Sequence, residues 1–340
     1  MRNETRLAFN AFKAAIAQLN GVPDVTEKFS VAPSVQQKLE GHIQESSDFL
    51  SRINNFGVTE QSGEKIGLGI GSSIASTTDT TSQDRVPTDP TSLDKQGYTC
   101  TQTNFDTAIK YAKLDAWAKF PNFQTMIRDQ IIRRQSLDII TIGFNGTSRA
   151  ATSNRATNPL LQDVNKGWLQ KMRENASGAR VLSQIGSTGK IVIGDGATAA
   201  TGYKNLDALV FDIVNNLIDP WYQEDTELVA IMGRALLADK YFPLINKVQD
   251  NSEKMAADVI VSQKRVGGLP AARVPNFPAN AILVTRFDNL SRYFQDGARR
   301  RTIIDNAKRD QIENYESSND AYVVEDYGLA ALAENIEIAA

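Results

Sequence analysis

The sequence predicts an α+β fold in which about two globular domains carry two extended appendages. Three observations lead to this prediction. Residues 57–111 combine alternating strand patterns with a long polar stretch, residues 123–144 form one long helical run, and residues from 168 onward alternate between helix and short strand patterns. The chain has 340 residues, which is enough for two domains that each bury a core.

The N-terminal residues 1–20 predict a short amphipathic helix, whose large apolar side chains share one face: Phe9, Phe12, Ile16 and Leu19. Gly21 and Pro23 end this helix, and residues 21–33 read as a polar linker. A tethered helix of this length cannot bury its apolar stripe alone, so it either packs on its own domain or serves as a detachable arm. Residues 33–54 predict a second helical segment, anchored by Leu39, Ile43, Phe49 and Ile53.

Residues 57–111 predict a long β-hairpin arm with a polar tip. Residues 66–70 and 105–111 alternate with period two, as strands do. Between them, residues 72–92 hold eleven Ser and Thr and cannot form a core of their own. The glycines at 67, 69 and 71 do not indicate a nucleotide loop, because no helix follows them and no Gly-Lys-Ser/Thr motif is present.

Residues 123–144 predict the longest helix, with a candidate buried stripe: Phe123, Ile127, Ile131, Leu137, Ile140 and Phe144. The polar faces of this helix carry three arginines: Arg128, Arg133 and Arg134. A solvated surface, or ion pairs between copies of the chain, explains them better than a nucleic-acid-binding patch. Further helices are expected at 206–217 and 233–241. Short strands are expected at 228–232, 259–261, 272–274 and 281–285.

The C-terminal region reverses its charge. Arg299, Arg300 and Arg301 form a basic run, whereas no Lys or Arg follows Arg309 and acidic residues such as Glu313 and Glu316 continue. Either the two regions pair between copies of the chain, or both are solvated. Residues 322–324 and 329–338 predict strands that return to the first domain.

Composition argues against most catalytic chemistry. The chain holds one cysteine, Cys100, and one histidine, His42. A lone cysteine excludes an internal disulfide, and most hydrolytic triads and zinc sites need histidine. The 37 Lys and Arg nearly balance 40 Asp and Glu, unlike the basic excess of a dedicated nucleic-acid binder. No catalytic residue, cofactor, metal site or membrane partner is therefore expected.

Several long segments, spread over essentially the whole chain, carry a family resemblance: QESSDFL at 44–50, GEKIG at 63–67, SIASTTDT at 73–80, RQSLD at 134–138, NLIDPWYQED at 216–225, LADKYFP at 237–243, NSE at 251–253 and ENYES at 313–317. With these segments the sequence resembles the major capsid proteins of tailed phages. Within that group it is most similar to the capsid proteins of temperate myophages of the Peduovirus group.

The resemblance implies a Hong-Kong-97-type capsid fold, with an N-terminal arm, an extended β-hairpin loop, a peripheral domain with a long spine helix, and an axial domain. It divides the chain into a scaffold-like arm at 1–31, the N-arm of the mature protein at 32–56 and the extended loop at 57–111. The peripheral domain with the spine helix follows at 112–167 and the axial domain at 168–300. Residues 301–340 would return to the peripheral domain.

The resemblance also implies function. Copies would assemble into hexamers and pentamers that form an icosahedral shell around packaged phage double-stranded DNA, held without sequence specificity. The chain would be made in the host cytoplasm and end in the virion. Expected partners are a phage scaffold and prohead protease, and the portal protein. Trimming is expected in the segment Phe29, Ser30, Val31 and Ala32. Candidate intersubunit residues are Lys65, Asp79, Arg85, Arg128, Arg133, Arg134, Arg299, Arg300, Arg301, Glu313 and Glu316.

Two other classes of protein remain open at this stage. One is a soluble α/β enzyme that uses carboxylate or lysine chemistry, and the other is a DNA-packaging accessory protein. An enzyme would form a small fixed oligomer, whereas a packaging protein would bind DNA with a steep salt dependence.

Overall fold

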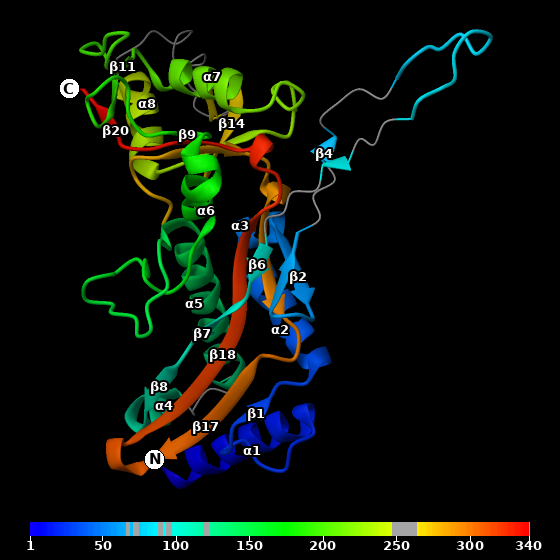
Figure 1. Cartoon of the computed structure of the whole chain (residues 1–340). Helices are drawn as coiled ribbons and strands as arrows, with labels where there is room; N and C mark the ends of the chain where they lie inside the picture. Colours follow the sequence, from blue (N-terminus) through cyan, green and yellow to red (C-terminus); the bar gives the residue numbers. More distant parts are fainter. Residues whose placement is uncertain are drawn as a thin grey trace.

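The computed structural model describes residues 1–65, 69–70, 75–87, 91–92, 97–117, 123–246 and 264–339. The chain forms an elongated half that contains the N-terminus and a compact half that contains the C-terminus, and a thin arm leaves the body near their junction (Figure 1). The predicted strand at 259–261 and most of the predicted strand at 66–70 lie outside the described residues.

A long sheet forms the elongated half. Its central strand, β18 (Gln311–Val324), runs the length of this half (Figure 1). The strands that pair along β18 are β17 (Arg300–Asn306), β16 (Leu290–Gln295), β8 (Thr107–Lys110) and β7 (Thr101–Asn104), all antiparallel to it. At the outer edges, β2 (Asn54–Val58) lies parallel to β16 and β1 (Phe29–Ser30) antiparallel to β17.

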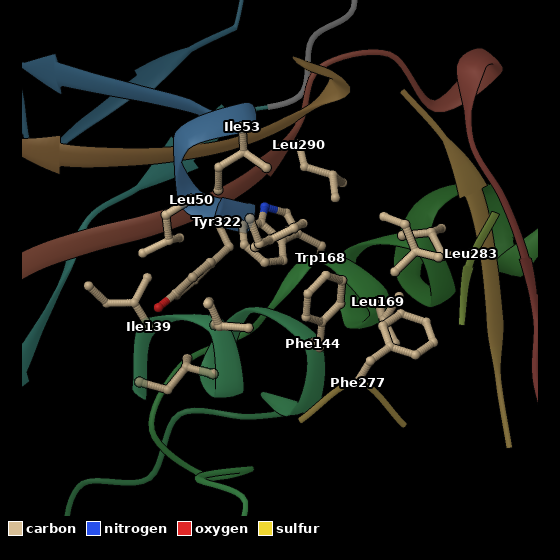
Figure 2. Packing of buried hydrophobic residues seen from close by; sticks show 14 of the residues in the cluster. Leu50, Ile53, Ile139, Phe144, Trp168, Leu169, Phe277, Leu283, Leu290 and Tyr322 are labelled. Carbon is tan, nitrogen blue, oxygen red and sulfur yellow. The ribbon is translucent and has the colours of Figure 1, made fainter. Parts of the chain in front are cut away.

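The helices of the elongated half are α1 (Asn3–Asn20), α2 (Pro33–Glu45), α3 (Asp48–Arg52), α4 (Tyr111–Trp117) and α5 (Phe123–Asn145). The short helix α6 (Trp168–Glu174) leads from α5 into the compact half. Trp168 is fully buried and packs edge-on against Phe144 and Tyr322 (Figure 2). It also packs edge-on against Phe49. Its indole Nε1 donates to the Ser291 carbonyl at 2.9 Å, so the largest core side chain leaves no polar atom unpaired.

The compact half contains a six-stranded sheet in the order β13-β14-β12-β15-β19-β9. Its strands are β13 (Arg265–Val266), β14 (Leu269–Arg273), β12 (Val229–Met232), β15 (Ile282–Thr285), β19 (Ala331–Ala333) and β9 (Val181–Leu182). A smaller parallel sheet joins β11 (Gly202–Tyr203), β10 (Ile191–Ile193) and β20 (Ile336–Ile338). The helices of this half are α7 (Leu206–Leu217) and α8 (Arg234–Asn246). Apolar side chains from α7, β12 and β15 share one core.

Two sequence predictions about strands need correction, and so does the grouping of residues 168–300 in one domain. Residues 107–110 form a strand but pair with β18 rather than with 66–70, so they belong to the body sheet and not to the arm. Residues 290–295 also lie in the long sheet, whereas residues 331–338 join the sheets of the compact half instead of returning to the elongated half. Local patterns identified strands at 105–111 and 329–338 but not at 290–295, and pairing between distant segments is not encoded in local spacing.

The buried face of the long helix is also rotated from the predicted stripe. Ile132, Ile139 and Ile142 are buried, whereas Ile127 and Ile131 are only partly covered. From Ile139 to Phe144 the helix is enclosed on all sides, because α6 and the sheet pack against it together. A single-stripe pattern therefore describes only its N-terminal part.

Candidate assembly and processing elements

The arm consists of paired strands that lead to an exposed tip. β3 (Ser62–Glu64) pairs antiparallel with β6 (Gly97–Thr99), and β4 (Gly69–Ile70) with β5 (Thr91–Ser92). Residues 75–87 beyond them are all exposed, including Asp79 and Arg85, and the arm points away from the body (Figure 1). These residues bury almost none of their surface against their own chain, so that surface is available to contact another molecule.

The base of the arm is fixed to the body. Lys65 is 7% exposed, and its Nζ donates to the Val324 carbonyl at 2.7 Å. The Tyr98 and Tyr293 rings meet edge-on with centroids 5.0 Å apart. Lys65 was expected at a contact between subunits, but its ammonium is held inside its own chain. This contact ties the chain to the body where the arm begins.

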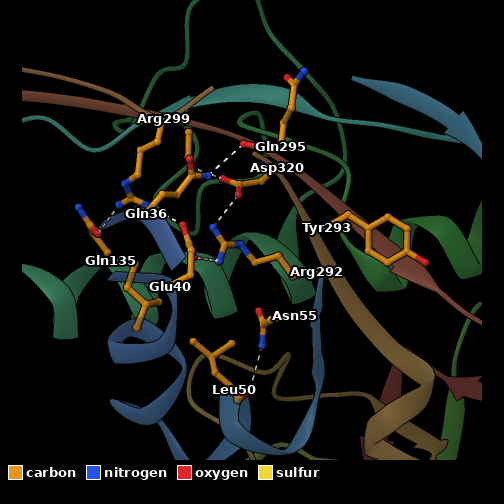
Figure 3. Close-up of polar contacts among 12 residues, drawn as sticks. Gln36, Glu40, Leu50, Asn55, Gln135, Arg292, Tyr293, Gln295, Arg299 and Asp320 are labelled. Carbon is orange, nitrogen blue, oxygen red and sulfur yellow. Dashed lines mark hydrogen bonds and ion pairs between the residues drawn. The ribbon is translucent and has the colours of Figure 1, made fainter. Parts of the chain in front are cut away.

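A buried charge network joins α2 to the long sheet. Glu40 accepts from Arg292 Nη1 at 2.6 Å and from Arg299 Nη1 at 2.5 Å (Figure 3). Arg292 also pairs with Asp320 at 2.6 Å, and Arg299 with Glu316 at 2.7 Å. None of these side chains is more than 5% exposed. One carboxylate from α2 thus bridges two arginines of the sheet.

Charge balance explains why the network is stable when buried. Burial by itself raises the pKa of Glu40, but the two guanidiniums outweigh it and leave that pKa below its ordinary value. The pKa of Glu316 is lowered in the same way, by Arg299 and Arg301 against the effect of burial. Gln135 of α5 supplements the pairing, with its amide donating to Glu316 and accepting from Arg299. Loss of Arg292 would leave the buried carboxylate of Asp320 without its partner.

The network corrects two predicted intersubunit residues. Arg299 and Glu316 were expected at contacts between copies, whereas both are paired inside one chain and closed to solvent. Sequence reasoning also missed Glu40, Arg292 and Asp320 as members of this network. One signal was available, because Gln36 and Glu40 lie on the same helical face as Ile43, where polar side chains need partners.

The N-terminal residues 1–31, which we call the strap, are docked on the end of the long sheet. Phe9 and Ile16 of α1 are buried in a separate apolar cluster with Ile303 and Ile312 of the sheet. The segment 21–33 is not a free polar linker, since Val25, Phe29 and Val31 are each less than 9% exposed. Leu19, predicted on the buried face, is 66% exposed. The first helix was expected either to pack on its own domain or to serve as a detachable arm, and in this structure it packs on its own domain.

The remaining predicted contact residues lie on the surface or in local pairs. Arg128 pairs with Asp129 at 2.9 Å, and Arg134 with Asp138 at 2.7 Å. Arg133 and Arg300 are exposed. Arg301 donates to Asn314 at 2.7 Å and Glu313 accepts from Tyr315 at 2.8 Å. An intersubunit role for these residues stays a prediction.

The described residues contain no arrangement typical of a catalytic or metal centre. Within them, no three His, Cys, Asp or Glu side chains gather closely enough to hold a metal ion. Burial raises the pKa of the Cys100 thiol to about 12, which removes its nucleophilic form at neutral pH. His42 is exposed beside Glu45, 3.6 Å away. No described helix is long and apolar enough to cross a membrane.

The fold and its projecting arm define the class of phage capsid proteins. The structure superposes on a chain of the satellite phage P4 procapsid that includes the size determination (Sid) protein, with a TM-score of 0.82, 51% identity and coverage of 100% of this chain and 99% of that chain. The capsid of an empty GTA particle shares the fold alone, with a TM-score of 0.51 at 17% identity over 86% of this chain and 90% of that one. The expected Hong-Kong-97-type fold is confirmed.

The particular family follows from the sequence comparisons. The model of the phage major capsid protein P2 family matches residues 8–336, and the chain belongs to this family. It is 56% identical to the capsid proteins of Escherichia phage P2, over 99% of this chain and 96% of theirs. It is 44% identical to the major capsid protein of Serratia phage KSP20, over 100% of this chain and 98% of that one.

Family membership decides between the classes left open by the sequence. The chain is a major capsid protein that forms the icosahedral shell of a phage virion, and it is a structural protein rather than an enzyme. Neither the soluble enzyme nor the DNA-packaging accessory protein is favoured.

Proposed function

We propose that copies of this chain form hexamers and pentamers in which the arm of each copy lies over a neighbour. The exposed tip at residues 75–87 is the observation that supports this, because an ordered polar extension of this kind gains buried area only against a second molecule. In this proposal the elongated half is the peripheral domain, with α5 as its spine helix. The compact half, including residues 331–338, is the axial domain at the centre of each capsomer.

We further propose that the strap engages a phage scaffold and is removed by the prohead protease between Phe29 and Ala32. The proposal is supported by the way the chain is anchored on either side of this segment. The strap has its own apolar cluster. Helix α2, which follows it, is held separately by Glu40 and by Gln36, whose amide donates to the Gln295 carbonyl at 3.0 Å. A cut between them would leave the buried charges of the network paired.

The proposed shell also meets a portal protein and encloses double-stranded DNA without reading its sequence. A nearly neutral chain supports this, since a strongly charged subunit would repel its own copies, and the inner face need only tolerate the DNA phosphates.

Deletion of residues 75–87 tests the role of the arm. We expect the deletion variant to keep its melting temperature within a few degrees, because this segment is exposed, but to form no closed shells with its scaffold. Light scattering and negative-stain electron microscopy measure assembly, and wild-type chain prepared in parallel is the control. Normal shells from the variant would contradict the proposal, as would a large loss of monomer stability.

A further inference from the structure

The bonds proposed for processing lie in a β-strand that is covered on one side by the body. β1 pairs with β17 in the register Phe29 with Arg301 and Ser30 with Arg300. The Val31 amide donates to the Arg299 carbonyl at 2.8 Å. Phe29 is 8% exposed and Val31 is 4% exposed, so their side chains point into the apolar cluster, while Ser30 faces outward.

A protease needs these same groups. It holds its substrate as an extended strand through backbone hydrogen bonds and places alternate side chains in pockets. In the docked strap, the backbone of β1 already forms hydrogen bonds with β17, and the side chains of Phe29 and Val31 are buried in the apolar cluster. The docked conformation is therefore not a substrate.

Helix α1 locks this segment in place. The Ala32 amide donates to Asn20 Oδ1 at 3.1 Å, and the Ile303 amide donates to the Val25 carbonyl at 2.9 Å, so the strap is tied down on both sides of β1. Asp305 of β17 accepts from both Arg6 of α1 and Tyr111. If β1 alone separated from β17, the contacts of α1 and Val25 with the body would remain and would favour its return.

We infer that residues 1–31 form a self-protecting strap, in which α1 must leave the body before the bonds between Phe29 and Ala32 can be cut. The biological meaning of this inference rests on the proposed processing, but the protection itself is a property of the unassembled chain. Whatever displaces α1, such as a scaffold or a neighbouring copy, then decides when cutting occurs.

Limited proteolysis of the full-length, unassembled chain by thermolysin tests the inference. Thermolysin cuts before apolar residues unless proline follows them, so the Ser30–Val31 bond reports on the strap. The bond before Ala75, at the start of the exposed tip, is an internal reference. Ala75 is exposed. In the wild type we expect cleavage before Val31 to be at least tenfold slower than cleavage before Ala75, followed by mass spectrometry of the fragments. Equal rates would overturn the inference.

A matched pair of variants identifies α1 as the lock. Phe9→Ala with Ile16→Ala removes the docking side chains of α1, whereas Leu7→Ala with Leu19→Ala removes side chains that are 70% and 66% exposed on the same helix. We expect the first pair to speed cleavage before Val31 by tenfold or more with the tip rate unchanged, and the second pair to change neither. If the first pair leaves the Val31 rate unchanged, β1 opens by itself and the lock is refuted.

A second variant covers the case in which Phe9→Ala with Ile16→Ala does not fold. Asp305→Asn removes the charge that Arg6 and Tyr111 share, while every apolar contact stays, so a smaller acceleration is expected. No acceleration would again refute the lock. Neither measurement involves the phage protease, so a full-length chain in finished particles would refute the processing proposal while leaving strap protection intact.

Discussion

Single residues determine how α2 is attached to the body. Glu40 is the one carboxylate that this helix supplies to the buried network, and it faces two arginines that come from the long sheet. Buried pairs of this kind add little stability compared with apolar packing, yet removing one member is strongly destabilising. Both pairs connect α2 to the long sheet through the same carboxylate.

Substitution of Glu40 by Gln should therefore destabilise the chain far more than its size change suggests. We expect a loss of about 2–3 kcal/mol and a clearly lower melting temperature, because two charge-assisted hydrogen bonds are weakened while Arg292 keeps Asp320 and Arg299 keeps Glu316. Glu45→Gln on the same helix is the control, because Glu45 is 79% exposed and should have little effect. Equal melting temperatures for the two variants would contradict the importance of the network.

Acid should weaken the same network. The folded chain lowers the pKa of Glu40 and Glu316 below their ordinary value of 4.5, so their contribution to stability is present above pH 4.5 and is lost as pH falls through the lower folded values. We expect the wild-type melting temperature to drop in that range and Glu40→Gln to show a shallower dependence. Parallel curves for the two proteins would show that Glu40 is not responsible.

At the scale of elements, α5 and α6 approach so closely that only glycine fits between them. A Cβ on Gly143 would lie 2.1 Å from the Trp168 ring, whereas a Cβ on Gly41 of α2 would meet nothing within 4 Å. The two glycines look alike in sequence, since both interrupt helical patterns, but only one is required by packing.

Gly143→Ala should therefore lower stability by about 1–3 kcal/mol or more through overpacking. Gly41→Ala should leave it unchanged or raise it by about 0.5–1 kcal/mol, since alanine favours the helix. Thermal melting of the two variants measures the difference. A stable Gly143→Ala protein would show that α6 can shift away from α5 without cost.

Local patterns predicted the elements better than their partners. Periodicity located α1, α5 and α7, because an amphipathic stripe repeats within one segment. The placement of β16 and of residues 331–338 escaped it, since strand pairing joins segments far apart in the chain. Arg299 and Glu316 were misjudged for a related reason: charged side chains are expected in solvent, and only the folded chain brings Glu40 and Gln135 beside them.

At the scale of the whole molecule, the chain consists of a shell-forming body and a strap that is docked but separately held. Membership of the P2 family of phage major capsid proteins establishes the shell. Helix α1 precedes residues 29–32 in the chain, whereas the buried network holds α2, which follows them, so the body should stay intact when the strap is lost. This division is the central claim of the account.

The intact mass of the protein taken from finished particles tests that claim most directly. We expect a chain that begins between Ser30 and Ala32 and otherwise extends to residue 340, while proheads arrested before processing hold the full-length chain. Finished particles built from chains that still begin at residue 1, or that begin within α2, would contradict it.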